Sequence, residues 1–165
     1  MKTVLFVCSG NTCRSPMAEA IFDNLIDEHP SLKAQDVRIR SAGTFAVEGA
    51  EMTGFAQQTL EKMGIEPPRK HKATHFNSEL AEEADLILAM QEQHLEEISA
   101  LCPEAENKAH TLKGYAHYID GYTGSEEYDI EDPFCQPFEE YYECGLDIKQ
   151  QIELLLGRLE KEWKE

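Results

Sequence analysis

The sequence has no apolar segment long enough to cross a membrane, and the apolar run after Lys2 is too short for the core of a signal peptide. Basic residues are also few, because 15 Lys and Arg stand against 32 Asp and Glu, which leaves a net charge of −17. Such a charge repels nucleic acids and anionic membrane surfaces, so we expect neither as a partner. Repeats, low-complexity tracts and long linkers are missing too, and the 165 residues are predicted to form a single domain, 1–165.

Cysteine is scarce and odd in number, which excludes the paired disulfide framework of a small secreted domain. The cysteines are Cys8, Cys13, Cys102, Cys135 and Cys144. We therefore expect a reducing cytoplasm, in which a cysteine that matters does so through its chemistry. The histidines show no ligand spacing with cysteines or carboxylates, so neither a metal nor another cofactor is predicted. The sequence does not determine the oligomeric state, for which a monomer is the simplest expectation.

Apolar runs that suit β-strands alternate along the chain with patterns that suit helices. Residues 3–8 and 86–90 are continuous apolar runs, typical of parallel strands buried on both faces, whereas 37–41 alternates as a strand near an edge does. Residues 109–112 form a shorter strand candidate. This order predicts an α/β fold in which a four-stranded parallel sheet, Rossmann-like, carries helices on both faces. Ligands of such sheets bind beyond the carboxyl ends of the strands.

Helices are predicted where apolar residues recur at helical spacing. Gly64 is placed to end the second of them, and Trp163 is expected to be a packing anchor at the end of the last. The apolar positions are, helix by helix, Met17, Ile21 and Leu25; Phe55, Leu60 and Met63; Leu95, Ile98 and Leu101; and Ile148, Ile152, Leu155, Leu159 and Trp163.

The segment CSGNTCRS, residues 8–15, follows the first predicted strand and precedes a predicted helix. Gly10 and Asn11 tolerate left-handed backbone angles, which a nest of successive backbone N–H groups requires. Ser15 and Pro16 are expected as the cap and the first residue of the helix. Because such a loop before a helix N-terminus binds anions, the segment is predicted to hold a phosphate dianion.

Cys8 and Arg14 give this loop its chemistry. The helix N-terminus and the Arg14 guanidinium favour the thiolate form of Cys8, and Arg14 can form two hydrogen bonds to a phosphate. A thiolate beneath a bound phosphate can attack phosphorus in line, with the loop N–H groups holding the equatorial oxygens. Taken singly, Cys8 is more simply a buried strand cysteine, and Arg14 is more simply a solvated residue at the start of a helix. The Cys-x5-Arg-Ser spacing between a strand and a helix favours a catalytic role for both. Cys13 is either a partner of Cys8 in a reversible disulfide or a small apolar residue beneath the loop.

Asp132, in the stretch YDIEDPFCQPFEE, is the best candidate for the general acid that such a cleavage needs. It precedes Pro133, which biases it toward an extended conformation, so its side chain would project from a loop. An Asp-Pro pair in an acidic loop is usually only a turn. Together with the Cys8 loop, a catalytic role becomes the favoured interpretation.

With these motifs, the chain resembles the low-molecular-weight protein-tyrosine-phosphatase family over nearly its whole length. The resemblance rests on FVCSGNTCRSPMAEAIF, RSAGTFA, ADLILAM and the late DPF. It implies a four-stranded parallel sheet and a phosphocysteine intermediate on Cys8. It further implies that Arg14 binds the phosphate and that Asp132 acts first as acid and then as base. The implied partners are phosphorylated proteins, which are the substrates.

The resemblance also implies supporting residues. Asn11 and Ser15 would maintain the loop geometry and the thiolate, and Ser41 and His71 match positions of the same hydrogen-bond network. The substrate-binding residues expected from the loop and the resemblance are Ser9, Gly10, Asn11, Thr12, Cys13, Ser15 and Phe134.

Two positions depart from the tyrosine-specific pattern, in which a branched apolar residue usually stands at Thr12 and a tyrosine at Phe134. CSGNTCRSPMAEA, SAGTFA and LILAMQEQH look closer to the bacterial protein-arginine phosphatases of the family, which typically have threonine at this place. A hydroxyl suits a guanidinium or its attacking water, and the Asp132 carboxylate could hold the guanidinium. We therefore expect a phosphatase for phosphoarginine, with phosphotyrosine as the alternative. Cys135 replaces a glycine that is common at this place. The loop that carries Asp132, called the acid loop below, is therefore expected to be stiffer or redox-sensitive.

Two other functions share a cysteine placed over a phosphate loop. Arsenate reductases need two further, closely spaced cysteines after the third strand, and residues 85–101 contain none. Phosphocarrier domains of sugar-uptake systems pass the phosphate on without a positioned acid, and Asp132 argues against that function. Both are remote alternatives to a hydrolase.

Overall fold

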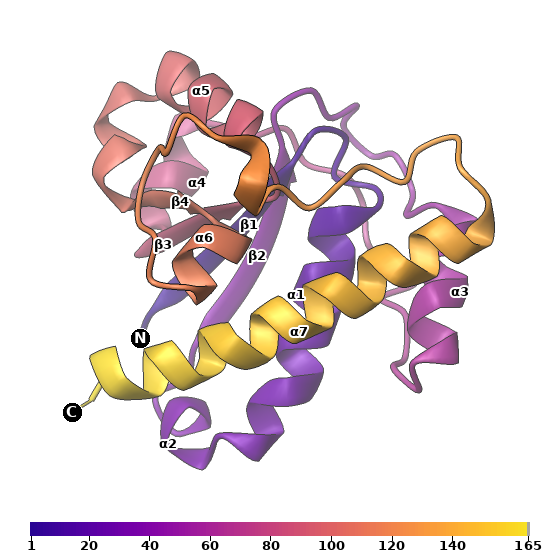
Figure 1. The fold of residues 1–165 in the computed structure, drawn as a ribbon, viewed down its shortest axis with the longest axis horizontal. Coiled ribbons are helices and arrows are strands. Elements are labelled where there is room, and N and C mark those ends of the chain that lie inside the picture. Colours follow the sequence, from indigo (N-terminus) through magenta and orange to yellow (C-terminus); the bar gives the residue numbers. More distant parts are fainter. Residues whose placement is uncertain (165) are drawn as a thin grey trace.

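A four-stranded parallel sheet lies at the centre of the computed structural model, which describes residues 1–164 (Figure 1). The strands are β1 (Thr3–Cys8), β2 (Arg38–Gly43), β3 (Leu86–Ala89) and β4 (Ala109–Thr111), in the spatial order β2-β1-β3-β4. The α-helices are α1 (Arg14–Leu25), α2 (Pro30–Lys33), α3 (Gly54–Lys62), α4 (Ser78–Glu83), α5 (Glu92–Leu101), α6 (Leu112–Ala116) and α7 (Phe138–Glu162). The 3-10 helices are η1 (Ile26–Glu28), η2 (Pro103–Lys108) and η3 (Glu126–Tyr128).

The predicted fold class is confirmed, because helices cover both faces of the sheet. On one face, Val4 and Phe6 of β1 join a core formed with α1, α3 and α7. On the other, Leu5 and Val7 pack with residues of α4 and α5. Every residue of β1 is buried, as its continuous apolar run predicts for a central strand. The alternating segment at 37–41 is indeed the edge strand β2.

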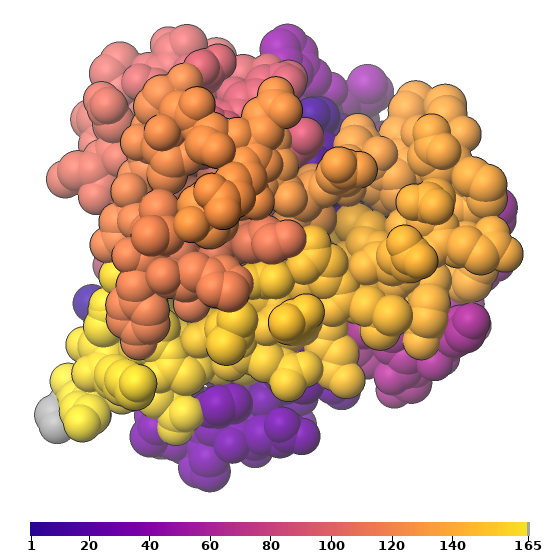
Figure 2. Space-filling model, in the orientation of Figure 1, coloured from indigo at the N-terminus to yellow at the C-terminus, as the bar shows by residue number. Residues whose placement is uncertain are grey.

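Helix α7 spans much of one side of the molecule, as Figure 2 shows in yellow and orange. Its buried stripe includes Ile148, Ile152, Leu155 and Leu159, and the helix begins well before this stripe, at Phe138. Trp163 follows the last turn and packs, partly buried, against the core, as expected of an anchor. No helix within residues 1–164 has both the length and the apolar character needed to span a membrane.

The helices that the sequence does not predict are the short ones, α2, α4 and α6. Each is too short to show a helical period, so local capping and packing decide it. Asn77 caps α4 by accepting a hydrogen bond from the Leu80 N–H at 2.9 Å, and Thr111 caps α6 by accepting one from the Gly114 N–H at 3.0 Å. Gly64, with a φ of 77°, follows the end of α3 as predicted.

The register of the sheet places Cys8 at the carboxyl end of a central strand. Cys8 pairs with Gly43, the last residue of β2, and its carbonyl accepts a hydrogen bond from Thr44 N–H at 3.0 Å. On the other side, Met90 N–H donates to the Val7 carbonyl at 2.9 Å, so β3 ends at the same edge. The loop after β1 therefore lies between the loops that follow β2 and β3.

Gly145 lets α7 approach α3, and we expect Gly145→Ala to destabilise the fold. A Cβ at this position would lie 2.5 Å from Thr59 Cγ2, and Thr59 is held in place by donating a hydrogen bond to the Phe55 carbonyl at 2.9 Å. Overpacking of this kind lowers the free energy of unfolding by about 1–3 kcal/mol, which chemical denaturation would measure.

Gly157→Ala on the same helix is the matched control, because a Cβ there would have no atom within 4 Å. Its better helix propensity should raise the free energy of unfolding by about 0.5–1 kcal/mol. Equal effects of the two substitutions would show that close packing at Gly145 is not the constraint.

Candidate active site

The thiol of Cys8 lies at the floor of the loop formed by residues 8–15. It is almost fully buried, and its sulfur accepts a hydrogen bond from the Asn11 backbone N–H at 3.3 Å. The Ser15 hydroxyl oxygen lies 3.0 Å from the same sulfur. The Asn11 N–H thus donates to this sulfur and the Ser15 hydroxyl is close enough to do the same, so the loop directs hydrogen-bond donors at Cys8.

Asn11 determines the curl of the loop. It is fully buried and has a φ of 55°, the left-handed conformation predicted for it. Its side-chain amide donates to Ser15 Oγ at 2.8 Å and to Ser41 Oγ at 3.0 Å, while its Oδ1 accepts from Thr74 N–H at 2.9 Å. Of the two residues that tolerate this conformation, Asn11 adopts it and Gly10 does not, and both ends of the Asn11 amide are held by hydrogen bonds.

The residues that the resemblance placed in this network are present in it. His71 Nε2 donates to the Asn11 carbonyl at 2.7 Å, and Ser41 donates to Glu19 Oε1 at 2.6 Å. Burial raises the pKa of Glu19 above its usual value. Asn11 thus connects β2, α1 and the segment after α3.

The prediction that Ser15 caps α1 with Pro16 as its first residue is wrong. The helix begins at Arg14, Cys13 is the residue before it, and no side chain caps the N-terminus. The Ser15 hydroxyl is instead occupied by Cys8 and Asn11. The tertiary contacts of the serine therefore outweigh its local capping preference.

Arg14 is buried, with a side chain only 2% exposed, and three groups hold its guanidinium. Nη1 donates to Gln91 Oε1 at 2.7 Å and to the Ile130 carbonyl at 2.8 Å. Nη2 lies 3.5 Å from Asp132 Oδ2, and the Asp132 side chain is 44% exposed. Arg14 and Asp132 are thus brought together from opposite ends of the sequence.

The acid loop is anchored two residues before Asp132. Ile130 N–H donates to the Met90 carbonyl at 2.8 Å, and Asp129 Oδ1 accepts from the N–H of Glu92 at 2.7 Å. The end of β3 and the start of α5 therefore position this loop. Asp132 itself projects from an irregular segment, as its place before Pro133 predicts.

Phe134 and Cys135 complete the acid loop. Phe134 is 68% exposed, and its N–H donates to Asp132 Oδ1 at 3.1 Å, which orients the carboxylate. Cys135 is exposed and has a φ of 64°, a conformation that strains side chains other than that of glycine. The strain explains why glycine would suit this position.

The remaining loop residues take different places. Cys13 is buried, and burial raises the pKa of its thiol far above the ordinary value, so it is a neutral thiol. Burial likewise raises the pKa of Cys144 to about 12. Cys8 and Cys13 are both reduced in this structure, and the disulfide between them stays a prediction. Thr12 is partly exposed, and its carbonyl accepts from Thr53 N–H at 2.9 Å.

Sequence reasoning missed two residues of this site, Gln91, which precedes α5, and His94 in the first turn of that helix. The sequence gives His94 no role, yet its Nε2 lies 2.9 Å from Ser9 Oγ. Burial and the nearby Arg14 lower the pKa of His94 to about 3, so the imidazole is neutral. No motif in the sequence indicates these contacts, because they join residues far apart in the chain.

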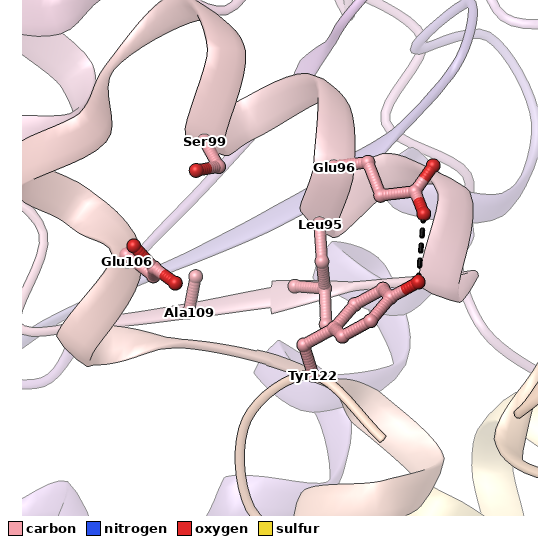
Figure 3. Close-up of a pocket in the computed structure, with 6 residues that line it drawn as sticks. All are labelled: Leu95, Glu96, Ser99, Glu106, Ala109 and Tyr122. Atoms are coloured by element: carbon pink, nitrogen blue, oxygen red, sulfur yellow. Dashed lines mark hydrogen bonds between the residues drawn. The ribbon is translucent and has the colours of Figure 1, made fainter. Parts of the chain in front are cut away.

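A cavity of about 310 Å³ adjoins the acid loop, and carboxylates dominate its lining. Its lining residues are Gln91, Glu126, Asp129, Glu131 and Asp132. A second cavity, of about 320 Å³, lies beside α5, where the Tyr122 hydroxyl donates to Glu96 at 2.8 Å (Figure 3). It contains none of the predicted site residues. Within residues 1–164, no group of three His, Cys, Asp or Glu residues could hold a metal ion.

Comparison with known proteins identifies this arrangement of parallel sheet, cysteine loop and late aspartate as that of a small phosphatase. The model of the family "Low molecular weight phosphotyrosine protein phosphatase" matches residues 3–165. The chain is 36% identical to a protein-arginine-phosphatase of Geobacillus stearothermophilus, over 96% of this chain and 97% of that protein. It therefore belongs to the low-molecular-weight phosphatase family, and it is a hydrolase.

Two solved structures have the same fold. One is a cysteine-to-serine mutant of the YwlE arginine phosphatase with a phosphorylated active-site serine, with a TM-score of 0.84 and 34% identity over 96% of each chain. The other is a low molecular weight protein tyrosine phosphatase from T. tengcongensis, with a TM-score of 0.83 and 35% identity over 96% of this chain and 100% of that one.

Gly43 lets β2 approach the loop, and we expect Gly43→Ala to weaken phosphate binding strongly. A Cβ here would lie 2.4 Å from the Ser9 carbonyl oxygen and 2.9 Å from the Asn11 nitrogen. Both are backbone atoms, so the loop itself would have to move. The Kd for inorganic phosphate, measured by calorimetry, should rise by about 100-fold, as expected when reacting groups shift by an ångström.

Gly54→Ala serves as the control, since a Cβ at the start of α3 would meet no atom within 4 Å. Unchanged phosphate affinity in Gly43→Ala would show that the close approach of β2 does not shape the loop.

Proposed function

We propose that the protein is a cysteine-dependent protein phosphatase that acts through a phosphocysteine intermediate. The observation that carries this proposal is the position of the Cys8 sulfur, which receives donors from Asn11 and Ser15 at the N-terminus of a helix that begins with Arg14. A buried cation and the backbone N–H groups of the loop form a dianion site directly above a thiolate.

In the first step, the Cys8 thiolate attacks phosphorus and forms the S–P bond while the bond to the leaving group breaks. Asp132 donates a proton to the departing atom, and Arg14 with the loop N–H groups stabilises the charge on the equatorial oxygens. In the second step, Asp132 accepts a proton from a water molecule that attacks phosphorus. The S–P bond breaks, inorganic phosphate leaves, and the thiolate returns, stabilised by the hydroxyl of Ser15.

We infer that the phosphorylated residue is arginine. Thr12 offers a hydroxyl where a branched apolar side chain would pack on a phenol ring. Asp132, once it has given its proton to the departing nitrogen, is a carboxylate that can pair with the guanidinium. The carboxylates around the adjoining cavity favour basic substrates, as does the net charge of −17. The similarity to an arginine phosphatase supports this substrate, whereas phosphotyrosine is the alternative that the family name supports.

The expected substrate-binding residues contact different parts of the phosphorylated side chain. Backbone N–H groups of the loop bind the phosphoryl oxygens, Thr12 contacts the leaving group, and the exposed Phe134 forms a wall beside Asp132. We further propose that the enzyme acts as a monomer in the cytoplasm on phosphorylated proteins. A cysteine nucleophile needs the reducing conditions found there.

Asp132→Asn should lower kcat/KM for poor leaving groups by about 100-fold or more, because a positioned general acid contributes this much to the first step. The loss should be much smaller for aryl phosphates whose leaving group needs no proton. A plot of log kcat/KM against the leaving-group pKa, measured for both proteins, would show a steeper slope in the variant.

Glu131→Gln is the matched control, since it removes an exposed carboxylate next to the same position. If Asp132→Asn reduced kcat/KM equally for all leaving groups, the general acid would have to be another residue.

Thr12→Ile tests the substrate. On peptides that differ only in phosphoarginine or phosphotyrosine, the wild-type protein should show the higher kcat/KM for phosphoarginine. The variant should reduce this ratio by at least about tenfold, because a polar contact is replaced by apolar bulk.

Thr12→Val separates the two causes, since valine keeps the shape and loses only the hydroxyl. If the ratio of kcat/KM for phosphoarginine to that for phosphotyrosine decreased in both variants, the hydroxyl would be the source of the preference. If it decreased in Thr12→Ile alone, the size of the side chain would be the source. Preference for phosphotyrosine in the wild-type protein would identify a tyrosine phosphatase and contradict the inferred substrate.

A further inference from the structure

The start of α5 contacts both ends of the phosphate loop. Gln91, the residue before this helix, accepts a hydrogen bond from Arg14 Nη1 at 2.7 Å. One turn later, His94 Nε2 lies 2.9 Å from the hydroxyl oxygen of Ser9. Ser9 directly follows Cys8, and Arg14 closes the loop. The start of this helix therefore contacts the second and the last residue of the Cys-x5-Arg segment.

The contacts of His94 define its tautomer. The Gln91 backbone N–H donates to His94 Nδ1 at 3.1 Å, and an N–H group can only donate, so Nδ1 carries no hydrogen. The imidazole is completely buried, and the one charged side chain that lowers its pKa by proximity is the Arg14 guanidinium. A neutral ring with a bare Nδ1 must carry its hydrogen on Nε2. His94 therefore donates to Ser9 Oγ, and the serine oxygen accepts.

A charged His94 would break this arrangement. Protonation would place a second hydrogen at Nδ1, opposite the N–H of Gln91, and would set a cation beside Arg14. Gln91 links the two sides, because its side chain holds Arg14 while its backbone holds His94. The His94 N–H also donates to the Gln91 carbonyl at 3.0 Å, which locks the two residues together.

We propose that His94 is a positioning residue of the phosphate loop, which as an Nε2–H donor fixes Ser9 while Gln91 fixes Arg14, so that α5 sets the separation of Cys8 and Arg14. This inference rests on the proposed function, because it assigns a role within the same site. The thiolate and the guanidinium must hold opposite sides of one phosphoryl group, so a small change in their separation weakens catalysis.

Two substitutions of His94 test the hydrogen bond to Ser9. In His94→Gln, the side-chain amide nitrogen takes the place of Nε2 and can still donate to Ser9. In His94→Asn, the shorter amide takes the place of Nδ1 and cannot reach Ser9. With an aryl phosphate at a temperature well below unfolding, we expect His94→Asn to lower kcat by about 10- to 100-fold with a smaller change in KM. His94→Gln should recover most of this loss.

A double-mutant cycle with Ser9→Ala separates positioning from general damage to the fold. If His94 acts through Ser9, the kcat of the double variant His94→Asn and Ser9→Ala should be no lower than that of the more affected single variant. If the losses of kcat in the two single variants multiplied in the double variant, the proposal would be overturned. Equal losses of kcat in His94→Gln and His94→Asn would overturn it too.

Histidine tautomers measured by ¹⁵N NMR on the unmodified protein give a test that needs no turnover. We expect the Nε2–H tautomer of His94 to persist from pH 8 to pH 5, since its pKa is lowered to about 3 from the usual 6.5. An Nδ1–H tautomer, or titration near pH 6.5, would overturn the proposal.

The lowered pKa of His94 also determines how the stability of the protein depends on pH. Below pH 6.5 the unfolded chain binds a proton at His94 and the folded chain does not. The contribution of His94 to the free energy of unfolding is therefore complete above pH 6.5 and is lost as the pH falls toward 3. His94→Gln should therefore lose less stability than the wild-type protein between pH 7 and pH 4, and equal losses would overturn the buried neutral state.

Failure of the proposed function gives a different result. If the unmodified protein hydrolysed no phosphate ester, that function would fall, and the tautomer together with the Kd for inorganic phosphate would still decide the role of His94. A rise in this Kd in His94→Asn but not in His94→Gln supports positioning, and no difference between them contradicts it.

Discussion

The left-handed turn at Asn11 is the constraint on which the active site depends. A non-glycine residue in this conformation costs about 1–2 kcal/mol, so the surrounding structure must stabilise it. Asn11 is buried and bonded through its amide and its carbonyl to the loop, to β2 and to the segment after α3. The same turn aims its backbone N–H at the Cys8 sulfur. The conformation of one residue thereby connects the loop geometry, a hydrogen bond to the Cys8 sulfur and the packing of β2.

Around this turn, the loop is held by elements that follow neighbouring strands. Gly43 ends β2 beneath the loop, and the first turn of α5 follows β3 and holds Arg14 and Ser9. The Ile130 carbonyl then joins the acid loop to the same guanidinium. Parallel strands end at one edge of the sheet, so residues from distant parts of the sequence meet there. The buried Arg14 guanidinium is held by two neutral acceptors, Gln91 Oε1 and the Ile130 carbonyl, and by the half-exposed Asp132 carboxylate.

Much of the fold was predictable because the strands are strongly patterned. The buried run at β1, the edge strand β2 and the strand β3 appear where their patterns indicate, and Gly64 ends α3. Errors arose where a local preference met a tertiary contact. Ser15 has the chemistry of a helix cap, yet its hydroxyl lies against the Cys8 sulfur, and Gly10 has freedom that the loop does not use. The short helices α2, α4 and α6 were not predicted, because one or two turns are too short to show the helical period of apolar residues.

The sequence by itself determined the reaction class, since Cys8 and Arg14 stand at a telling spacing within one short loop, and together with that loop Asp132 before a proline became the favoured acid. It also determined the parallel sheet, because continuous apolar strands need covered faces. Only the tertiary structure decided which groups support these residues. Gln91, His94 and the Ile130 carbonyl act through single hydrogen bonds across the chain, and the bond between His94 and Ser9 joins positions 85 residues apart. A contact between such distant residues leaves no pattern in one sequence, because its geometry exists only after the sheet has brought the strand ends together.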